Sequence, residues 1–252
     1  MECDENNALI IIPDVHGRQF WRYPAVTYRQ ASFVFLGDYL DPYDNIEDSI
    51  VFQELEDIVA FKKAYPNRVT LLLGNHDLHY LSDRIIKGSR YDEINEERNT
   101  AFFHNNRCCF QIAFEIMVNG MRYLFSHAGV GRMWIKDFAH LKDEDITAEW
   151  LNRCMNSYDF YDALNQVSAE RGGPEQYGSM IWADVQEQLS TPNVMMGLTQ
   201  VFGHTSLNRP LNIQNRIFCL DCGRAFYLNL ENGLIYDLTS DALIEESFGW
   251  MN

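Results

Sequence analysis

The sequence has few basic residues and no long apolar run. Its 20 Lys and Arg residues stand against 36 Asp and Glu residues, which gives a formal net charge of -16. Nonspecific binding to nucleic acid depends on Lys and Arg side chains that neutralise phosphates, so this composition argues against it. No stretch approaches the roughly 20 apolar residues that cross a bilayer, and we expect no membrane partner.

Cysteine is sparse, and no export signal accompanies it. The chain has six Cys residues, of which Cys219 and Cys222 have the spacing of a redox or zinc pair. No second pair completes a four-Cys zinc site, which favours a buried strand at this point. Residues 1–7 lack the basic start and apolar run of a signal peptide, so we expect a cytoplasmic protein with reduced thiols.

Linkers, repeats and low-complexity tracts are also missing. No segment rich in Pro, Gly or Ser divides the 252 residues, of which 46% are hydrophobic. A chain of this length and composition can bury one large α/β core. We therefore expect a single domain over residues 1–252.

Three apolar runs in the first third of the chain each end in polar side chains. Residues 9–12, 33–36 and 69–73 are typical of buried strands in a parallel sheet. The carboxyl ends of such strands meet at one edge of the sheet, where open α/β sheets bind ligands. The polar residues that follow the three runs are Asp14 and His16, Asp38 and Asp41, and Asn75, His76 and Asp77.

Helical segments separate these strands. Residues 46–65 carry apolar side chains near helical spacing, with Asn45 as the expected N-cap. The alternation of strands and helices predicts a doubly wound parallel sheet. Residues 78–107 are rich in charge and aromatic rings, and we interpret them as a helical cap insertion over the active edge, although a solvated helix pair also fits.

The second half of the chain has the pattern of another sheet. Asn119 and Gly120, between two apolar runs, are a strong hairpin signal. His127 follows the second of these runs, and His204 follows a short strand at 198–202. Three further strands are expected at 216–220, 225–230 and 234–238, so we predict a second, largely antiparallel sheet.

Six of the residues at strand ends are of types that ligate divalent metals. They divide between two ions, with Asp38 shared: Asp14, His16 and Asp38 for one, and Asp38, Asn75, His127 and His204 for the other. Two ions about 4 Å apart can lower the pKa of a shared water and clamp an oxyanion. Each segment alone could be a satisfied turn or cap, but five such segments in one chain favour a metal site.

The ordered segments resemble the motif series of the calcineurin-like metallophosphoesterases. The resemblance covers about residues 8–235 and is closest to the serine/threonine phosphoprotein phosphatases and the diadenosine tetraphosphate hydrolases. The segments that carry it are Asp14-Val15-His16-Gly17, Gly37-Asp38-Tyr39-Leu40-Asp41, Gly74-Asn75-His76-Asp77, Ser126-His127-Ala128-Gly129 and Gly203-His204-Thr205. Supporting segments include residues 119–125, 181–184 and 220–223.

The resemblance implies a fold and a cofactor. The fold is a four-layer α/β/β/α sandwich in which helices flank two mixed sheets, with a dinuclear centre between the sheets. The implied cofactor is two divalent or trivalent ions held by the six ligands named above. A shell of nitrogen and oxygen donors suits manganese or iron, and also zinc. The resemblance also implies that His76 is the general acid or an imidazole that contacts phosphate, and that Asp41 orients it.

Two departures from the family pattern bear on the substrate. Pro42 stands where many protein phosphatases have an Arg that clamps phosphate, so another cation must take that role. The substrate-binding candidates are Arg18, Arg171 and Arg224, together with Asn75, and each Arg could equally be a surface residue. The segment Gly203-His204-Thr205-Ser206 lacks the second His that many nuclease-like and phosphodiesterase-like relatives have, which favours the phosphatase branch.

The function that follows is metal-dependent hydrolysis of phosphate esters, with a phosphomonoesterase as the leading interpretation. The substrate would be a phosphoprotein, a nucleotide or a small molecule. Hydrolysis of a dinucleoside polyphosphate is the alternative, with Tyr80, Tyr91, Tyr158 and Tyr177 available to stack on a base. A non-catalytic metal-binding scaffold is a third reading, which the retention of Asp41 and His76 disfavours.

Overall fold

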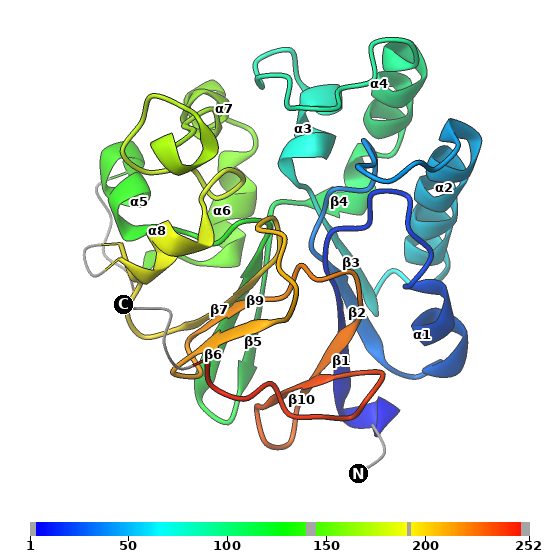
Figure 1. The fold of residues 1–252 in the computed structure, drawn as a ribbon, viewed down its shortest axis with the longest axis vertical. Helices are drawn as coiled ribbons and strands as arrows, with labels where there is room; N and C mark the ends of the chain where they lie inside the picture. The colour runs from blue at the N-terminus through cyan, green and yellow to red at the C-terminus, as the bar shows by residue number, and fades with distance from the viewer. Residues whose placement is uncertain (1–3, 140–144, 191–192, 248–252) are drawn as a thin grey trace.

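Four layers make up the computed structural model, which describes residues 4–139, 145–190 and 193–247. Two sheets face each other at the centre, and helices cover the outer side of each (Figure 1). The predicted α/β/β/α sandwich is confirmed.

The first sheet has a parallel centre. β1 to β3 pair in parallel, as the buried apolar runs predicted. β4 adds a fourth parallel strand that they did not predict, and β10 and β11 extend the β1 side in antiparallel pairing. All five residues of β1 are buried, because this strand is covered on both faces. In spatial order the strands are β11 (Ile235–Asp237), β10 (Phe226–Asn229), β1 (Ala8–Ile12), β2 (Ser32–Phe35), β3 (Val69–Leu72) and β4 (Phe110–Gln111).

The second sheet is mixed, so the expectation of a largely antiparallel sheet is wrong. β6 pairs in parallel with β7, and β7 with β9, while the two outer pairs are antiparallel. Two of the three strands expected near the carboxyl end, β10 and β11, join the first sheet instead. A hydrophobic pattern predicts a strand but not its partner, which long-range packing selects. The order is β5 (Ala113–Val118), β6 (Met121–Ser126), β7 (Thr199–Phe202), β9 (Ile217–Cys219) and β8 (Leu211–Ile213).

The helices form the two outer layers and a group above the strand ends. α1 (Arg22–Thr27) and α2 (Asp48–Ala64) cover the first sheet, and α3 (Asn75–Leu81) and α4 (Glu96–Asn105) lie beyond the carboxyl ends of its strands (Figure 1). On the second sheet lie α5 (Arg132–Ala139), α6 (Ala148–Cys154), α7 (Tyr158–Leu164) and α8 (Val185–Leu189). Among the described residues, no helix is both long and apolar enough to cross a membrane.

α2 shows how the local sequence sets an element. Its buried face carries Val51, Leu55 and Ile58, at the spacing that an amphipathic helix requires. The helix begins at Asp48 after Glu47, so Asn45 is not its N-cap as expected. The expected position was off by two residues, within the usual uncertainty of helix ends.

The hydrophobic core packs the two sheets against each other. Leu9 and Ile11 of β1 pack with the inner face of the second sheet, in the same cluster as Phe125 and Val201. Ile10, between them in sequence, packs in the cluster that includes the α2 residues. Because both sheets are locked through this interior, the loops at their carboxyl ends are held in fixed relation to each other.

Candidate active site

Four of the residues at the strand ends have strained backbone. His16, Asp38, Asp41 and His204 have φ angles of 45°, 53°, 57° and 63°, in the left-handed region that non-Gly residues rarely adopt. Each costs about 1–2 kcal/mol. Such strain persists only where the surroundings fix the chain, and it concentrates at functional sites.

Hydrogen bonds to a backbone carbonyl and to a buried carboxylate hold these loops in place. The carbonyl of Asp38 accepts from the N–H groups of both Val15 and His16, at 3.0 and 2.8 Å. The buried carboxylate of Asp77 accepts from the N–H groups of Asp38 and Tyr39, at 2.7 and 2.9 Å. The loops after β1, β2 and β3 are thereby tied together.

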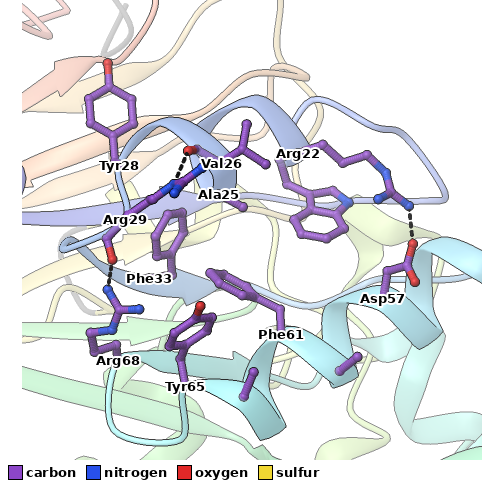
Figure 2. A pocket seen from close by; sticks show the side chains of 13 residues that line it. Arg22, Ala25, Val26, Tyr28, Arg29, Phe33, Asp57, Phe61, Tyr65 and Arg68 are labelled. Carbon is purple, nitrogen blue, oxygen red and sulfur yellow. Dashed lines mark hydrogen bonds and ion pairs between the residues drawn. The ribbon is translucent and has the colours of Figure 1, made fainter.

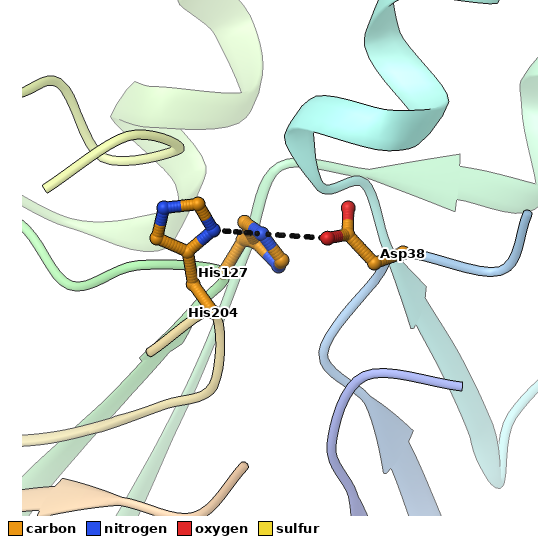
Figure 3. Close-up of side chains that lie close together, drawn as sticks. All are labelled: Asp38, His127 and His204. Carbon is orange, nitrogen blue, oxygen red and sulfur yellow. Dashed lines mark hydrogen bonds and ion pairs between the residues drawn. The ribbon is translucent and has the colours of Figure 1, made fainter. Parts of the chain in front are cut away.

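Two clusters of potential ligands meet at Asp38. Asp14, His16 and Asp38 form the Asp14 cluster, and Asp38, His127 and His204 form the His127 cluster, which Figure 3 shows. In each cluster, one ligand atom per residue lies within 4.8 Å of the others. The structure thus brings together residues that follow strands of both sheets, in the grouping that the sequence predicted.

In His16 and His127, a backbone carbonyl binds Nδ1 and leaves Nε2 facing the other ligand atoms. His16 Nδ1 lies 2.7 Å from the Leu40 carbonyl oxygen, and His127 Nδ1 lies 2.9 Å from that of Leu36. A carbonyl oxygen only accepts, so Nδ1 carries the hydrogen in both rings. The Nε2 lone pair is therefore the one that each ring offers to a cation once the ring is neutral, and a backbone carbonyl fixing the other nitrogen is the usual arrangement around ligating His.

Asp38 stands between these lone pairs. Its Oδ1 accepts from the N–H of His76 at 3.0 Å. Its Oδ2 lies 3.6 Å from His16 Nε2 and 3.4 Å from His127 Nε2. One carboxylate oxygen thus faces both clusters, which is the position required of a bridging ligand.

The donor set fits a pair of cations. Besides Asp38, the Nε2 atom of His127 faces Asn75 Oδ1 and His204 Nδ1, both at 3.0 Å. The other ring nitrogen of His204, Nε2, is buried without a hydrogen-bond partner among the described residues. Burial disfavours the charged His127 ring, yet Asp38 and Asp14 raise the pKa of His127 to about 10, so the site attracts positive charge.

Two glycines make room for the carboxylates. A Cβ added to Gly74 would collide with Asp38 Oδ1, and one added to Gly203 would collide with Asp14 Oδ1. Both positions therefore exclude any side chain. These are the glycines that precede Asn75 and His204 in the sequence motifs.

His76 lies beside the two clusters in an acid–base network. Its Nδ1 is 2.9 Å from Asp41 Oδ2, and Tyr80 donates to the other Asp41 oxygen at 2.6 Å. Burial works against the charged His76 ring, but Asp38 and Asp41 outweigh it and raise the pKa of His76 above 6.5. The network therefore favours the protonated form of the His76 imidazole.

A cavity of about 590 Å³ opens over both clusters and over His76. Arg18 and Arg171 line it, as do the rings of Tyr43 and Trp182. Arg18 Nη2 donates to the Asp14 carbonyl at 2.7 Å, and Arg171 Nη2 donates to the Thr205 hydroxyl at 2.6 Å. The cavity thus has two fixed guanidinium groups beside a carboxylate and imidazole floor.

Other sequence candidates lie elsewhere. Arg224 does not line the cavity, and its Nε lies 3.1 Å from Asp237 Oδ2. Tyr80 is only 1% exposed and stacks on Tyr91, so its ring is not available to a base. Tyr91, Tyr158 and Tyr177 are likewise not among the residues that line this cavity.

Sequence reasoning assigned no site role to three contributors. Tyr43 and Trp182 reach the cavity from loops that no periodic pattern marks, although Trp182 lies in the segment 181–184 that supported the family resemblance. His79 lies 2.8 Å from the same Asp41 oxygen that His76 contacts. His79 follows His76 by three residues, a spacing that places both on one face of the helix α3, and this spacing was an available signal.

The Cys pair takes no part in a metal cluster among the described residues. Cys219 is fully buried in β9, as the buried-strand reading predicted, and its Sγ lies 3.4 Å from the Gly203 carbonyl oxygen. Cys222 follows the strand and is half-buried.

A second cavity of about 590 Å³ lies between α1 and α2, at the amino ends of β2 and β3 (Figure 2). Phe33 and Phe61 pack edge to face within it, and Arg22 pairs with Asp57 at its rim. Among the described residues, it shares no lining residue with the first cavity and contains none of the ligand clusters. The chemistry therefore belongs to the cavity above Asp38.

Comparisons with known proteins agree with this geometry. A family model described as calcineurin-like phosphoesterase matches residues 9–221. A cold-active protein-tyrosine phosphatase of a psychrophilic Shewanella species aligns over 91% of this chain and 76% of its own, with 17% identity and a TM-score of 0.58. A Saccharomyces cerevisiae protein serine/threonine phosphatase with similarity to human phosphatase PP5 aligns over 98% and 82%, with 16% identity and a TM-score of 0.53.

Comparison with curated protein sequences gave no significant match. At 16% and 17% identity, the two structural neighbours establish a shared fold and no shared substrate. The family model is stronger evidence of relationship, because it spans most of the chain and all six candidate ligands. The chain therefore belongs to the calcineurin-like phosphoesterase family of metal-dependent hydrolases.

Proposed function

We propose that this protein is a phosphomonoesterase with a dinuclear centre. The observation that carries the proposal is that Asp38 Oδ2 faces lone pairs of both clusters, at 3.6 and 3.4 Å, beside a His76 ring that lines the same cavity. Asp14, His16 and Asp38 would hold one ion, and Asp38, Asn75, His127 and His204 the other. The mixed nitrogen and oxygen donors support manganese or iron.

When bound, such ions lower the pKa of a shared water and neutralise charge on the phosphoryl group. The residues of the chain supply the rest of the chemistry. His76, with a raised pKa, donates a proton from Nε2 to the leaving oxygen, while Asp41 holds Nδ1. No Ser or Cys nucleophile is required.

Arg18 and Arg171 are the proposed phosphate contacts. Both line the cavity, and their hydrogen bonds to Asp14 and Thr205 hold the guanidinium groups in fixed orientations. A fixed guanidinium can hold two phosphate oxygens at once. Arg224, which pairs with Asp237 outside the cavity, is not proposed for this role.

Hydrolysis of a dinucleoside polyphosphate is the second candidate. The aromatic rings of Tyr43 and Trp182 line the cavity and favour it, because a base can stack on such rings. The Tyr residues first considered for stacking are not needed for this alternative.

The experiment is turnover of p-nitrophenyl phosphate, bis-p-nitrophenyl phosphate and diadenosine tetraphosphate after reconstitution with manganese. We expect metal-dependent turnover that is fastest on the monoester and collapses in both Asp38→Asn and His76→Asn. Preference for diadenosine tetraphosphate would select the second candidate. Binding of two metals without turnover on any substrate would contradict both and favour a non-catalytic scaffold.

A further inference from the structure

Two adjacent residues, Gly88 and Ser89, are connected to opposite sides of the His76 ring. The N–H of Gly88 donates to His79 Nδ1 at 3.2 Å, and His79 Nε2 lies 2.8 Å from Asp41 Oδ2. That oxygen is 2.9 Å from His76 Nδ1. One chain of contacts therefore runs from Gly88 to the Nδ1 side of His76.

A second chain reaches the opposite nitrogen. The hydroxyl groups of Ser89 and Tyr43 lie 2.8 Å apart, and the Tyr43 hydroxyl lies 3.4 Å from His76 Nε2. Tyr43 and Ser89 both line the active-site cavity. The nitrogen that would donate to substrate thus faces a hydroxyl that residue 89 anchors.

The tautomer of His79 follows from its partners. A backbone N–H only donates, so His79 Nδ1 is the acceptor nitrogen of its ring. With Nδ1 accepting, the ring carries its hydrogen on Nε2, directed at the Asp41 side, and burial lowers the pKa of His79, which favours this neutral form. His79 Nε2 and Asp41 Oδ2 are in contact, but Nε2 has no partner in hydrogen-bond geometry among the described residues.

The same tautomer argues against a third metal site. Asp41, His76 and His79 are close enough to hold an ion. However, the lone pair of His79 is engaged by Gly88, and the nitrogen near Asp41 bears the hydrogen. His79 is therefore better matched to the role of a donor than to that of a ligand.

Packing fixes the chain of contacts that runs through His79. The rings of Tyr80 and Tyr91 meet the His79 ring edge to face, with centroids 4.5 and 4.7 Å away. His79 is 5% exposed and Asp41 3%. At Gly88, an added Cβ would lie 3.3 Å from the Trp182 ring, so the segment is held close to the cavity wall.

We propose that His79 and Tyr43 are positioning residues that hold the His76 imidazole from its two sides and tie its orientation to residues 88–89. The inference rests on the proposed role of His76 as proton donor. It gives the 78–107 segment a specific task, because the turn at 88–89 connects that segment to the reacting group. Substrate that enters the cavity then meets Tyr43 and His76 as one unit.

His79 is tested by removing its polar contacts and then restoring them. His79→Leu removes both the hydrogen bond from Gly88 and the contact with Asp41, whereas His79→Gln retains an N–H for Asp41 and an oxygen for Gly88. We expect His79→Leu to lower kcat about tenfold or more with little change in KM, since general acid catalysis contributes roughly 100-fold or more. His79→Gln should recover most of this loss, and His104→Leu, on exposed α4, is the control.

A readout without substrate separates this inference from the proposed function. In ¹⁵N-edited NMR spectra, His76 should give a protected Nδ1–H resonance, identified by its loss in His76→Asn. We expect the resonance to survive in His79→Gln and to exchange rapidly in His79→Leu. If the wild type hydrolyses no phosphate ester, the proposed function fails, while this comparison still decides the role of His79.

Two results would overturn the role of His79. One is that His79→Leu keeps both the kcat of the wild type and its protected His76 Nδ1–H resonance. The other is an equal loss in both variants, which would mean that packing of the imidazole matters and its polar contacts do not.

Tyr43 is tested by removing its hydroxyl. Tyr43→Phe and Ser89→Ala should each lower kcat/KM about threefold to tenfold, as loss of one neutral hydrogen bond does. Tyr23→Phe, at an exposed position of α1, is the matched control. Wild-type kinetics in both variants would remove Tyr43 from the proposal.

Discussion

Asp38 and His127 face each other from different sheets, with Oδ2 of the carboxylate 3.4 Å from Nε2 of the imidazole. Asp38 follows β2 of the first sheet, and His127 follows β6 of the second. The packed interior between the sheets sets this distance. A cation held between the two residues would therefore link the two halves of the sandwich.

Metal content should depend on which cluster is altered. Asp38→Ala should lose both ions, because its Oδ2 faces both clusters. His16→Ala and His204→Ala should each lose one, since each belongs to a single cluster. Metal per chain, measured by elemental analysis after dialysis, checks this, with exposed His104→Ala as control. Retention of one ion in Asp38→Ala would contradict a bridging role.

The pH dependence of kcat should shift when Asp41 loses its charge. Burial lowers the pKa of His76, and Asp38 and Asp41 together raise it above 6.5. In Asp41→Asn the raising effect of this carboxylate is gone, so the pKa of His76 falls. Activity that requires protonated His76 should then decline at lower pH than in the wild type. The alkaline limb of kcat against pH is the measurement.

The control for this pH experiment is Asp159→Asn, at an exposed position on α7. Its alkaline limb should coincide with that of the wild type. An unchanged limb in Asp41→Asn would show that the ionisation governing activity is not that of His76.

Substitution of the three candidate Arg residues should affect KM and kcat/KM to different extents. Arg18→Gln and Arg171→Gln remove charges that line the cavity, and each should raise KM or lower kcat/KM for p-nitrophenyl phosphate about tenfold or more. Arg224→Gln should be close to the wild type, because Arg224 pairs with Asp237 outside the cavity. A larger effect from Arg224 than from the other two would contradict the assignment.

Stability should depend on Glu54, away from the active-site cavity. Glu54 is 1% exposed and accepts hydrogen bonds from Trp21, Gln19 and Arg22. In Glu54→Gln, an amide group replaces a carboxylate facing these donors, and we expect the free energy of unfolding to fall by about 2–3 kcal/mol. Part of the full cost of a broken buried pair is spared because the Arg22 side chain is 40% exposed.

Urea unfolding measures this change, with Glu56→Gln on the exposed face of the same helix as control. The control should stay within about 0.5 kcal/mol of the wild type. A Glu54→Gln protein as stable as its control would mean that water replaces the lost interactions.

The sequence alone determined much of this protein because local patterns specify local structure. The apolar runs before Asp14, Asp38 and Asn75 predicted three parallel strands, and the position of these residues at strand ends predicted that they would meet. The family resemblance predicted the four layers. These features depend on hydrophobic burial and on strand connection rules, which act over short stretches of chain.

The tertiary structure decided what depends on distant partners. Only packing selected the sheet that β10 and β11 join, and only the folded loops brought Tyr43 and residues 88–89 to His76. The same holds for the Arg candidates, since the sequence offered three and the cavity contains two. Side-chain direction and long-range pairing are set by contacts between residues far apart in the chain, and no local pattern encodes them.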